Sequence, residues 1–177
     1  MIKKICEYNP RTEFILSILK NVVADKLNEQ IMILAHNKNL LSYIYNAINN
    51  RNIGCVGYYI GGMKQKDLKI SESKKIILAT YAMAEEALDI KTLTTLIMAT
   101  PKTDVTQAVG RILREKHEKP MVIDIIDGHN LFKKQWLKRL CFYKKNKYTI
   151  EYNNEENEEK EEKEQVLKGK CHINLEC

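Results

Sequence analysis

Five short, uninterrupted apolar runs constrain the fold of this chain more than any other feature of its sequence. They are rich in β-forming residues and too short to be helices. A strand that is apolar along its whole length is buried on both faces, which is typical of a parallel sheet. The runs are residues 31–35 (IMILA), 54–60 (GCVGYYI), 75–80 (KIILAT), 95–100 (TLIMAT) and 121–126 (MVIDII).

Helical patterns lie between and around these runs. Helices and strands alternate along much of the chain, with short connections and no internal repeat. This order predicts one open α/β sheet with helices on both of its faces. The predicted helices are residues 11–28, 39–50, 104–115 and 129–145.

The charge is distributed unevenly along the 177 residues. The formal net charge is +6, but residues 1–150 carry 25 Lys and Arg against 14 Asp and Glu, and residues 151–177 carry 4 against 9. A basic body suits a polyanionic partner such as a nucleic acid. The acidic tail, residues 151–177, has too few apolar side chains to offset the entropy of ordering, and we expect it to be disordered.

Two kinds of signal are missing from the sequence. It contains no apolar run of about 18 to 20 residues, and its first ten residues, MIKKICEYNP, have no signal-peptide core. We therefore expect no membrane span and an intracellular protein. Without C-x-x-C spacing among the cysteines we expect no metal site and no disulfide framework. The cysteines are Cys6, Cys55, Cys141, Cys171 and Cys177.

Polar and charged segments follow the third and fourth apolar runs. YAMAEEALDI follows the third run and PKTDVTQAVGRILR follows the fourth. The carboxyl ends of parallel strands are where ligands bind in open α/β sheets. An ordinary surface helix does not account for Asp89, nor for Gln107, Arg111 and Arg114, which would share nearly one helix face. These residues are therefore candidates for a functional site.

The two segments together resemble a known family. ILATYAMAEEALDI followed closely by ATPKTDVTQAVGRILR resembles motifs V and VI of superfamily 2 helicases, and QIMILAHNKNLLSYI has the position of motif IV. The sequence of these motifs resembles the helicases of large nucleo-cytoplasmic DNA viruses, the group related to the poxvirus transcript-release DNA helicase. The resemblance covers roughly residues 11–150. It implies the second, C-terminal RecA-like lobe of such a helicase, preceded by a linker at residues 1–10.

The resemblance also implies roles for individual residues. Arg111 and Arg114 would be arginine fingers that reach ATP held by another lobe, where a guanidinium grips phosphate oxygens in two directions. Gln107, Asp89 and Gly110 would bind ATP. The residues expected to contact nucleic-acid phosphates are Thr80, His36, Asn37, Lys38, Gly61 and Gly62. The implied partner is DNA rather than RNA, and the implied location is the host cytoplasm or the virion.

The chain departs from the family pattern in two places. Ala87 stands where motif V usually has glycine, and the sequence contains neither a G-x-x-x-x-G-K-[ST] phosphate loop nor a D-E-x-x metal-binding acid. We therefore expect ATP and Mg²⁺ to be held mainly by a first lobe, in cis or in trans, and the isolated chain to be inactive. We also expect that Met1 marks a cut between lobes.

One further interpretation of the function stays open. The chain could be an ATP-independent, basic nucleic-acid-binding module, whereas a dinucleotide-binding protein would need a Gly-rich first turn that is missing here.

In the last predicted helix we expect Trp136, Leu137 and Leu140 to form the buried stripe. Asp124 and Asp127, at the end of the last apolar run, are not expected to be catalytic.

Overall fold

The computed structural model describes residues 1–25, 29–86, 90–112 and 120–152, apart from the side chains of Glu86, Arg111 and Ile112. All of the strands in these residues are parallel and form one sheet in the order β2-β3-β1-β4-β5. This confirms the predicted open parallel α/β sheet. The expected disordered tail lies outside the described residues, except for its first two. The strands are β1 Gln30–Ala35, β2 Val56–Tyr59, β3 Ile76–Thr80, β4 Leu93–Met98 and β5 Met121–Asp124.

The helices differ from the prediction in three places. The predicted order had no helix between β2 and β3, but parallel neighbours need a crossover and α4 supplies it. The prediction also missed α5, which follows β3 directly, and α1, which lies within the expected linker. The helices are α1 Ile2–Cys6, α2 Asn9–Asp25, α3 Lys38–Asn50, α4 Gln65–Glu72, α5 Tyr81–Glu86, α6 Thr106–Ile112 and α7 Asn130–Lys145. None of the described helices is long and apolar enough to cross a membrane.

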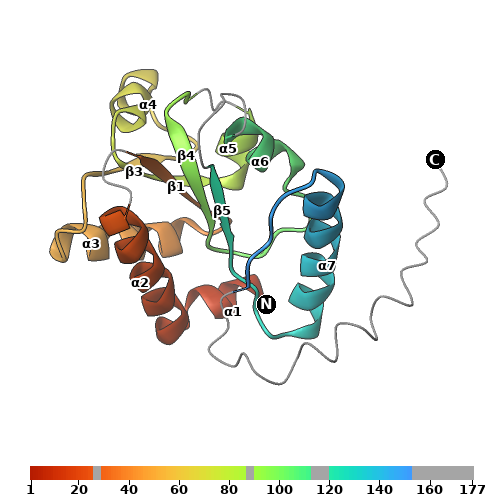
Figure 1. Ribbon diagram of the computed structural model, residues 1–177. Helices are drawn as coiled ribbons and strands as arrows, with labels where there is room; N and C mark the ends of the chain where they lie inside the picture. Colours follow the sequence, from red (N-terminus) through yellow and green to blue (C-terminus); the bar gives the residue numbers. More distant parts are fainter. Residues whose placement is uncertain (26–28, 87–89, 113–119, 153–177) are drawn as a thin grey trace, which may run out of the picture.

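The sheet is covered on both faces, as predicted. Successive strand residues point to opposite faces, so Ile31 and Ile33 pack with α2 and α3, while Met32 and Leu34 pack with α4, α5, α6 and α7. Figure 1 shows α2 and α3 on one side of the sheet and α5, α6 and α7 on the other. From β1 the chain passes through α3, on one face, to β2 at one edge of the sheet. From β2 it moves back across the sheet to β5 at the other edge, through α4, α5 and α6 on the opposite face. These opposite directions keep the crossovers right-handed.

The buried stripe of α7 differs from the predicted one. Leu137 is 54% exposed and Trp136 is only partly buried, whereas Phe132, Arg139 and Tyr143 are buried. These three residues are spaced by seven and four positions and share one helix face. The prediction for Leu137 was wrong because an arginine occupies the face that apolar spacing would assign to leucine.

Candidate functional site

The ends of β1, β3 and β4 come together at one edge of the sheet. His36 follows β1, Tyr81 follows β3, and Thr100 lies just beyond β4. The chain leaves β1 toward α3 on one face and leaves β3 and β4 toward α5 and α6 on the other. In open α/β sheets a crevice forms at such a point, and ligands bind there.

Hydrogen bonds join these three residues. The backbone N–H of His36 donates to Oγ1 of Thr100 at 3.0 Å, and Nδ1 of His36 lies 2.9 Å from the same oxygen. The Tyr81 hydroxyl donates to the Thr100 carbonyl oxygen at 2.6 Å, and the rings of His36 and Tyr81 lie 4.6 Å apart. The imidazole is therefore fixed in orientation while His36 remains exposed at the edge.

Two neighbouring charges act on this cluster. Partial burial of the imidazole lowers the pKa of His36, the charge of Lys102 lowers it further, and Glu85 opposes both effects. Lys102 forms an ion pair with Glu85, and its Nζ lies 4.9 Å from the centre of the Tyr81 ring. The ion pair also ties α5 to the segment that leads into α6.

The start of α6 is fixed by its own hydrogen bond. Oδ1 of Asp104 accepts from the backbone N–H of Thr106 at 2.9 Å, and this bond lowers the pKa of the Asp104 carboxyl. Ala108 and Val109 pack against the sheet, while Gln107 and Gly110 are exposed on the other side of the helix. The helix is thus held at a defined place beside the strand ends, with Gln107 and Gly110 facing outward.

The remaining residues of the predicted nucleotide site are only partly described. The main chain of Arg111 belongs to α6, but its side chain lies outside the described part of the chain. Arg114 and Asp89 lie outside the described residues altogether, as does Ala87. Their roles stay predictions.

The loops after β1 and β2 meet at the same edge. Asn37 is the N-cap of α3, and its Oδ1 accepts from the backbone N–H of Asn39 at 2.8 Å. Nζ of Lys38 donates to the carbonyl oxygen of Gly61 at 3.1 Å. Gly62 has φ of +93°, a backbone conformation that glycine adopts without strain. The structure therefore brings Asn37, Lys38 and Gly61 close together.

Thr80 completes this group from the neighbouring strand. It is the last residue of β3, and it lies in register with Ala35, the residue before His36. Its side chain is half-buried. A ligand that reaches His36 would therefore pass close to Thr80.

A buried arginine anchors α7 below this edge. Nε and Nη2 of Arg139 donate to the two carboxylate oxygens of Asp124 at 2.6 and 2.9 Å, and Nη1 donates to the carbonyl oxygen of Lys102 at 2.5 Å. The Tyr143 hydroxyl donates to Asp124 at 3.2 Å. Burial raises the pKa of the Asp124 carboxyl, and the Arg139 guanidinium opposes the rise. The sequence interpretation did not identify this pair.

A second arginine ties the start of α2 to the same edge. Nε and Nη2 of Arg11 donate to Asp127 at 2.6 and 2.8 Å, and Nη1 donates to the carbonyl oxygen of Ala99 at 2.8 Å. Asp127 and Asp124 are thus each bound by an arginine, as structural anchors. The only sequence signal for these pairs was the position of the two aspartates after the last apolar run.

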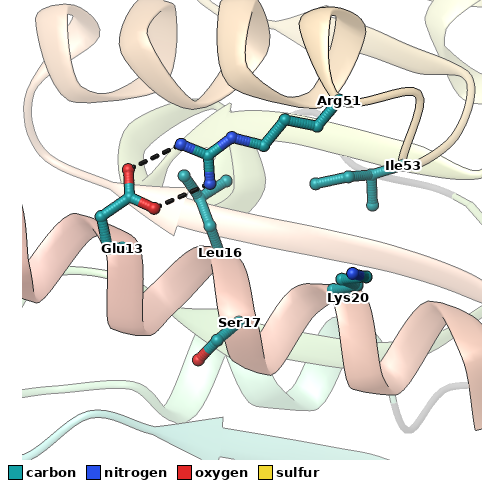
Figure 2. Close-up of a pocket in the computed structure, with 6 residues that line it drawn as sticks. All are labelled: Glu13, Leu16, Ser17, Lys20, Arg51 and Ile53. Carbon is teal, nitrogen blue, oxygen red and sulfur yellow. Dashed lines mark hydrogen bonds and ion pairs between the residues drawn. The ribbon is translucent and has the colours of Figure 1, made fainter.

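A groove of about 320 Å³ lies elsewhere, between α2 and the end of α3. Figure 2 shows that its two most prominent charged groups, Glu13 and Arg51, face each other across it, and they pair at 2.7 and 2.8 Å. Its lining includes neither His36, Tyr81 and Thr100 nor a residue of α6. Its lining residues are Glu13, Leu16, Ser17, Lys20, Arg51 and Ile53.

The described residues form no metal-binding cluster. Within residues 1–25, 29–86, 90–112 and 120–152, no group of three or more His, Cys, Asp or Glu side chains is arranged to hold a metal ion. The described residues at the strand ends offer hydroxyl, amide, imidazole and ammonium groups, which can donate hydrogen bonds to phosphate oxygens.

No family model matches the chain. Individual proteins of large DNA viruses are nevertheless similar to it in sequence. A protein of Acanthamoeba polyphaga mimivirus, provisionally named as an ATP-dependent RNA helicase, is 41% identical over 156 residues. These residues cover 85% of this chain and 30% of the mimivirus protein. A protein of African swine fever virus with the same provisional name is 30% identical over 130 residues, which cover 68% of this chain and 26% of that protein. The chain thus spans about a third or less of the length of these relatives.

Solved structures share the fold. T4 UvsW superposes with a TM-score of 0.68 at 22% identity, covering 83% of this chain and 35% of UvsW. The C-terminal domain of the DEAD-box protein Dbp5 superposes with a TM-score of 0.59 at 12% identity, covering 78% of this chain and 79% of that domain. The parallel sheet of this chain is therefore a RecA-like sheet.

The order of the strand-end segments, the viral relatives and the shared fold agree with one another. The chain belongs to the superfamily 2 helicases, as their C-terminal RecA-like domain, and the relatives that it matches are proteins of large DNA viruses.

Proposed function

We propose that this chain is the second motor lobe of an ATP-dependent nucleic-acid helicase or translocase. In this proposal residues 11–150 form the motor domain, and residues 1–10 belong to the linker from a first RecA-like lobe. That first lobe holds ATP and Mg²⁺, and this chain contributes arginine fingers and phosphate contacts.

The observation that carries the proposal is the meeting of His36, Tyr81 and Thr100 at one edge of the sheet. They come from the ends of three strands, and the loop that holds Thr100 leads directly into α6. One rigid edge therefore supports both proposed sites: the phosphate contacts at the ends of β1 to β3, and the helix that carries Arg111.

Arg111 and Arg114 are the proposed catalytic residues. Negative charge develops on the γ-phosphate oxygens during phosphoryl transfer, and a guanidinium fork placed in line stabilises that charge better than an ammonium group. Gln107, Gly110 and Asp89 are proposed to line the nucleotide beside them. The exposure of Gln107 and Gly110 on α6 supports this assignment.

The nucleic acid is proposed to cross the ends of β1, β2 and β3. Backbone N–H groups and hydroxyls there suit phosphate oxygens, which carry no sequence information. Closure of the two lobes on ATP, and reopening after hydrolysis, would move these contacts along the strand. The residues proposed for this role are Thr80, His36, Asn37, Lys38, Gly61 and Gly62.

The proposed strand is DNA, because the resemblance is to helicases of DNA viruses. The mimivirus and African swine fever virus relatives, in contrast, are named for RNA. Competition between DNA and RNA oligonucleotides of one sequence for the same protein tests this choice. Tighter binding of RNA would reverse it.

The test of the motor role uses a protein that joins this chain to a first RecA-like lobe. Arg111→Ala and Arg114→Ala should each lower ATP turnover by about 10³ to 10⁵, and Arg→Lys at either position should restore little of it. Arg51→Ala is the matched control, because Arg51 is an exposed arginine that pairs with Glu13 away from the strand ends. Normal turnover in both alanine variants would remove the arginine fingers from the proposal.

The basic charge of residues 1–150 favours one alternative, an ATP-independent nucleic-acid-binding module. In that case lysine would replace Arg111 and Arg114 freely. The alanine variants would bind nucleic acid slightly more weakly, and joining a first lobe would give no ATP turnover that depends on nucleic acid. The same set of variants therefore separates the two functions.

A further inference from the structure

The outer face of α7 has an unusual charge. The helix contains five lysines and no aspartate or glutamate between Asn130 and Lys145. All five lysines are exposed. They are Lys133, Lys134, Lys138, Lys144 and Lys145.

These lysines form one continuous face. With 3.6 residues per turn they fall within an arc of about 140° around the helix axis, and a helix of 16 residues is about 24 Å long. The opposite arc holds Phe132, Arg139 and Tyr143, which are buried against the sheet and its neighbours. We call the exposed arc the lysine face.

The lysine face has no counter-charge in the part of the chain that the structure describes. The ion pairs there join Arg11, Arg51, Lys102 and Arg139 to carboxylates, and none of them involves a lysine of α7. Five like charges along one helix repel one another, which is a cost unless a partner of opposite charge is bound.

The lysine face is also held rigidly to the proposed motor site. Arg139 joins α7 to β5 through Asp124, and to the segment before α6 through the carbonyl oxygen of Lys102. The guanidinium also lies 5.7 Å from the centre of the Trp136 ring. A ligand bound to the lysine face would therefore move together with α6 when the lobe moves.

The chemistry of the face selects one class of partner. Leu131 and Leu137 are exposed on it, but the main apolar stripe of α7 is buried, so the face lacks the broad apolar surface of a membrane-binding helix. Ammonium groups spaced along about 24 Å suit a polymer with a charge at every repeat. A nucleic-acid backbone has that charge pattern.

We propose that the lysine face of α7 is a second contact surface for the sugar–phosphate backbone of a nucleic acid, separate from the strand ends. The choice of partner rests on the proposed helicase function. The face lies on the outside of α7, which packs on the same side of the sheet as α5 and α6 (Figure 1). It would therefore bind a part of the strand that does not cross the sheet edge.

The test measures how the affinity depends on salt. Binding of the whole chain to a fluorescein-labelled oligothymidylate of about 20 nucleotides is followed by anisotropy between about 50 and 200 mM salt. Each phosphate contact to a single strand contributes about 0.7 to the slope of log affinity against log salt. For Lys134→Gln/Lys138→Gln, the loss of affinity over this fourfold range should therefore be about sevenfold smaller than in the unaltered chain.

The matched control is Lys20→Gln/Lys69→Gln. These two exposed lysines lie on α2 and α4, and the substitution changes the net charge by the same amount. Its salt slope should equal that of the unaltered chain. All variants should keep the same melting temperature, because the substituted side chains are exposed. Equal slopes for the α7 pair and the control pair would overturn the proposal. That result would mean either that the lysine face binds no partner or that acidic residues after 151 bind to it.

A third variant separates this inference from the proposed function. Lys38→Gln removes a lysine at the strand ends, where Lys38 approaches Gly61. If Lys38→Gln reduces the slope and the α7 pair does not, the lysine face fails alone. If neither variant changes the slope, the strand-end site fails as well.

Discussion

Arg139→Met should lower the free energy of unfolding of this domain more than almost any other substitution of a single charged residue. The guanidinium is 1% exposed, and Asp124, which it binds with two hydrogen bonds, is 10% exposed. In Arg139→Met the Asp124 carboxylate keeps, among the described residues, the Tyr143 hydroxyl at 3.2 Å, and the Lys102 carbonyl oxygen loses the guanidinium as a donor. Breaking such a buried pair costs about 3–5 kcal/mol, a large part of a typical total of about 5–15 kcal/mol.

The pH dependence of this loss follows from the same contacts. Burial already raises the pKa of Asp124, and Arg139 opposes the rise, so the pKa should rise further in Arg139→Met. A carboxyl whose pKa is raised in the folded state stabilises that state at low pH, and this stabilisation is lost as the pH rises through the folded pKa. The deficit of Arg139→Met relative to the unaltered domain should therefore be larger at pH 7 than at pH 5.

Urea unfolding followed by the fluorescence of Trp136, the single tryptophan, measures both effects. Arg51→Met, at an exposed pair, should leave the midpoint nearly unchanged. Asp124→Asn/Arg139→Met should be more stable than Arg139→Met, since it leaves no buried charge without a partner. The reasoning is refuted if Arg139→Met unfolds at the same urea concentration as Arg51→Met, or if its deficit grows as the pH falls.

Two further predictions concern stability measured in the same way. A Cβ added at Gly57 would lie 2.9 Å from Oγ of Ser71 and 3.0 Å from Cγ of Lys74, so Gly57→Ala should lower the free energy of unfolding by about 1–3 kcal/mol. A Cβ at Gly110 in α6 meets no atom within 4 Å, so Gly110→Ala should raise it by about 0.5–1 kcal/mol. Equal urea midpoints for the two variants would contradict this. Because the pKa of His36 is lowered from 6.5, the unfolded chain binds a proton there first, so the stability of the unaltered domain relative to His36→Gln should fall as the pH drops below about 6.5. A difference that stays constant with pH would show that the imidazole titrates normally.

The sheet could be predicted from the sequence because its strands are buried on both faces. Runs such as residues 31–35 and 75–80 are apolar at every position, and only a parallel sheet covered by helices explains that pattern. α4 escaped prediction because it packs with little more than Leu68, beside the small buried Ser71, in a segment rich in lysine. α5 has only six residues, which is too short for a periodic pattern.

The side-chain pairs of the site could not be predicted in the same way. Arg11 and Asp127 are 116 residues apart, and they meet only because the start of α2 and the end of β5 reach the same edge. Arg139 lies on the buried face of α7, where the apolar pattern favoured Leu137. His36 was singled out through family resemblance, yet its bond to Thr100 depends on β1 and β4 being neighbours in the sheet. Such contacts follow from topology, which local patterns do not contain.

The central claim is that this chain is one half of an ATP-driven motor, and ATP turnover tests it most directly. The measurement compares three proteins at saturating nucleic acid: this chain alone, a first RecA-like lobe alone, and the two joined. The proposed function predicts turnover stimulated by nucleic acid in the joined protein, and only background turnover in either part, because it assigns the arginines and the triphosphate-binding residues to different lobes. Turnover by this chain alone at the level of the joined protein would contradict the claim.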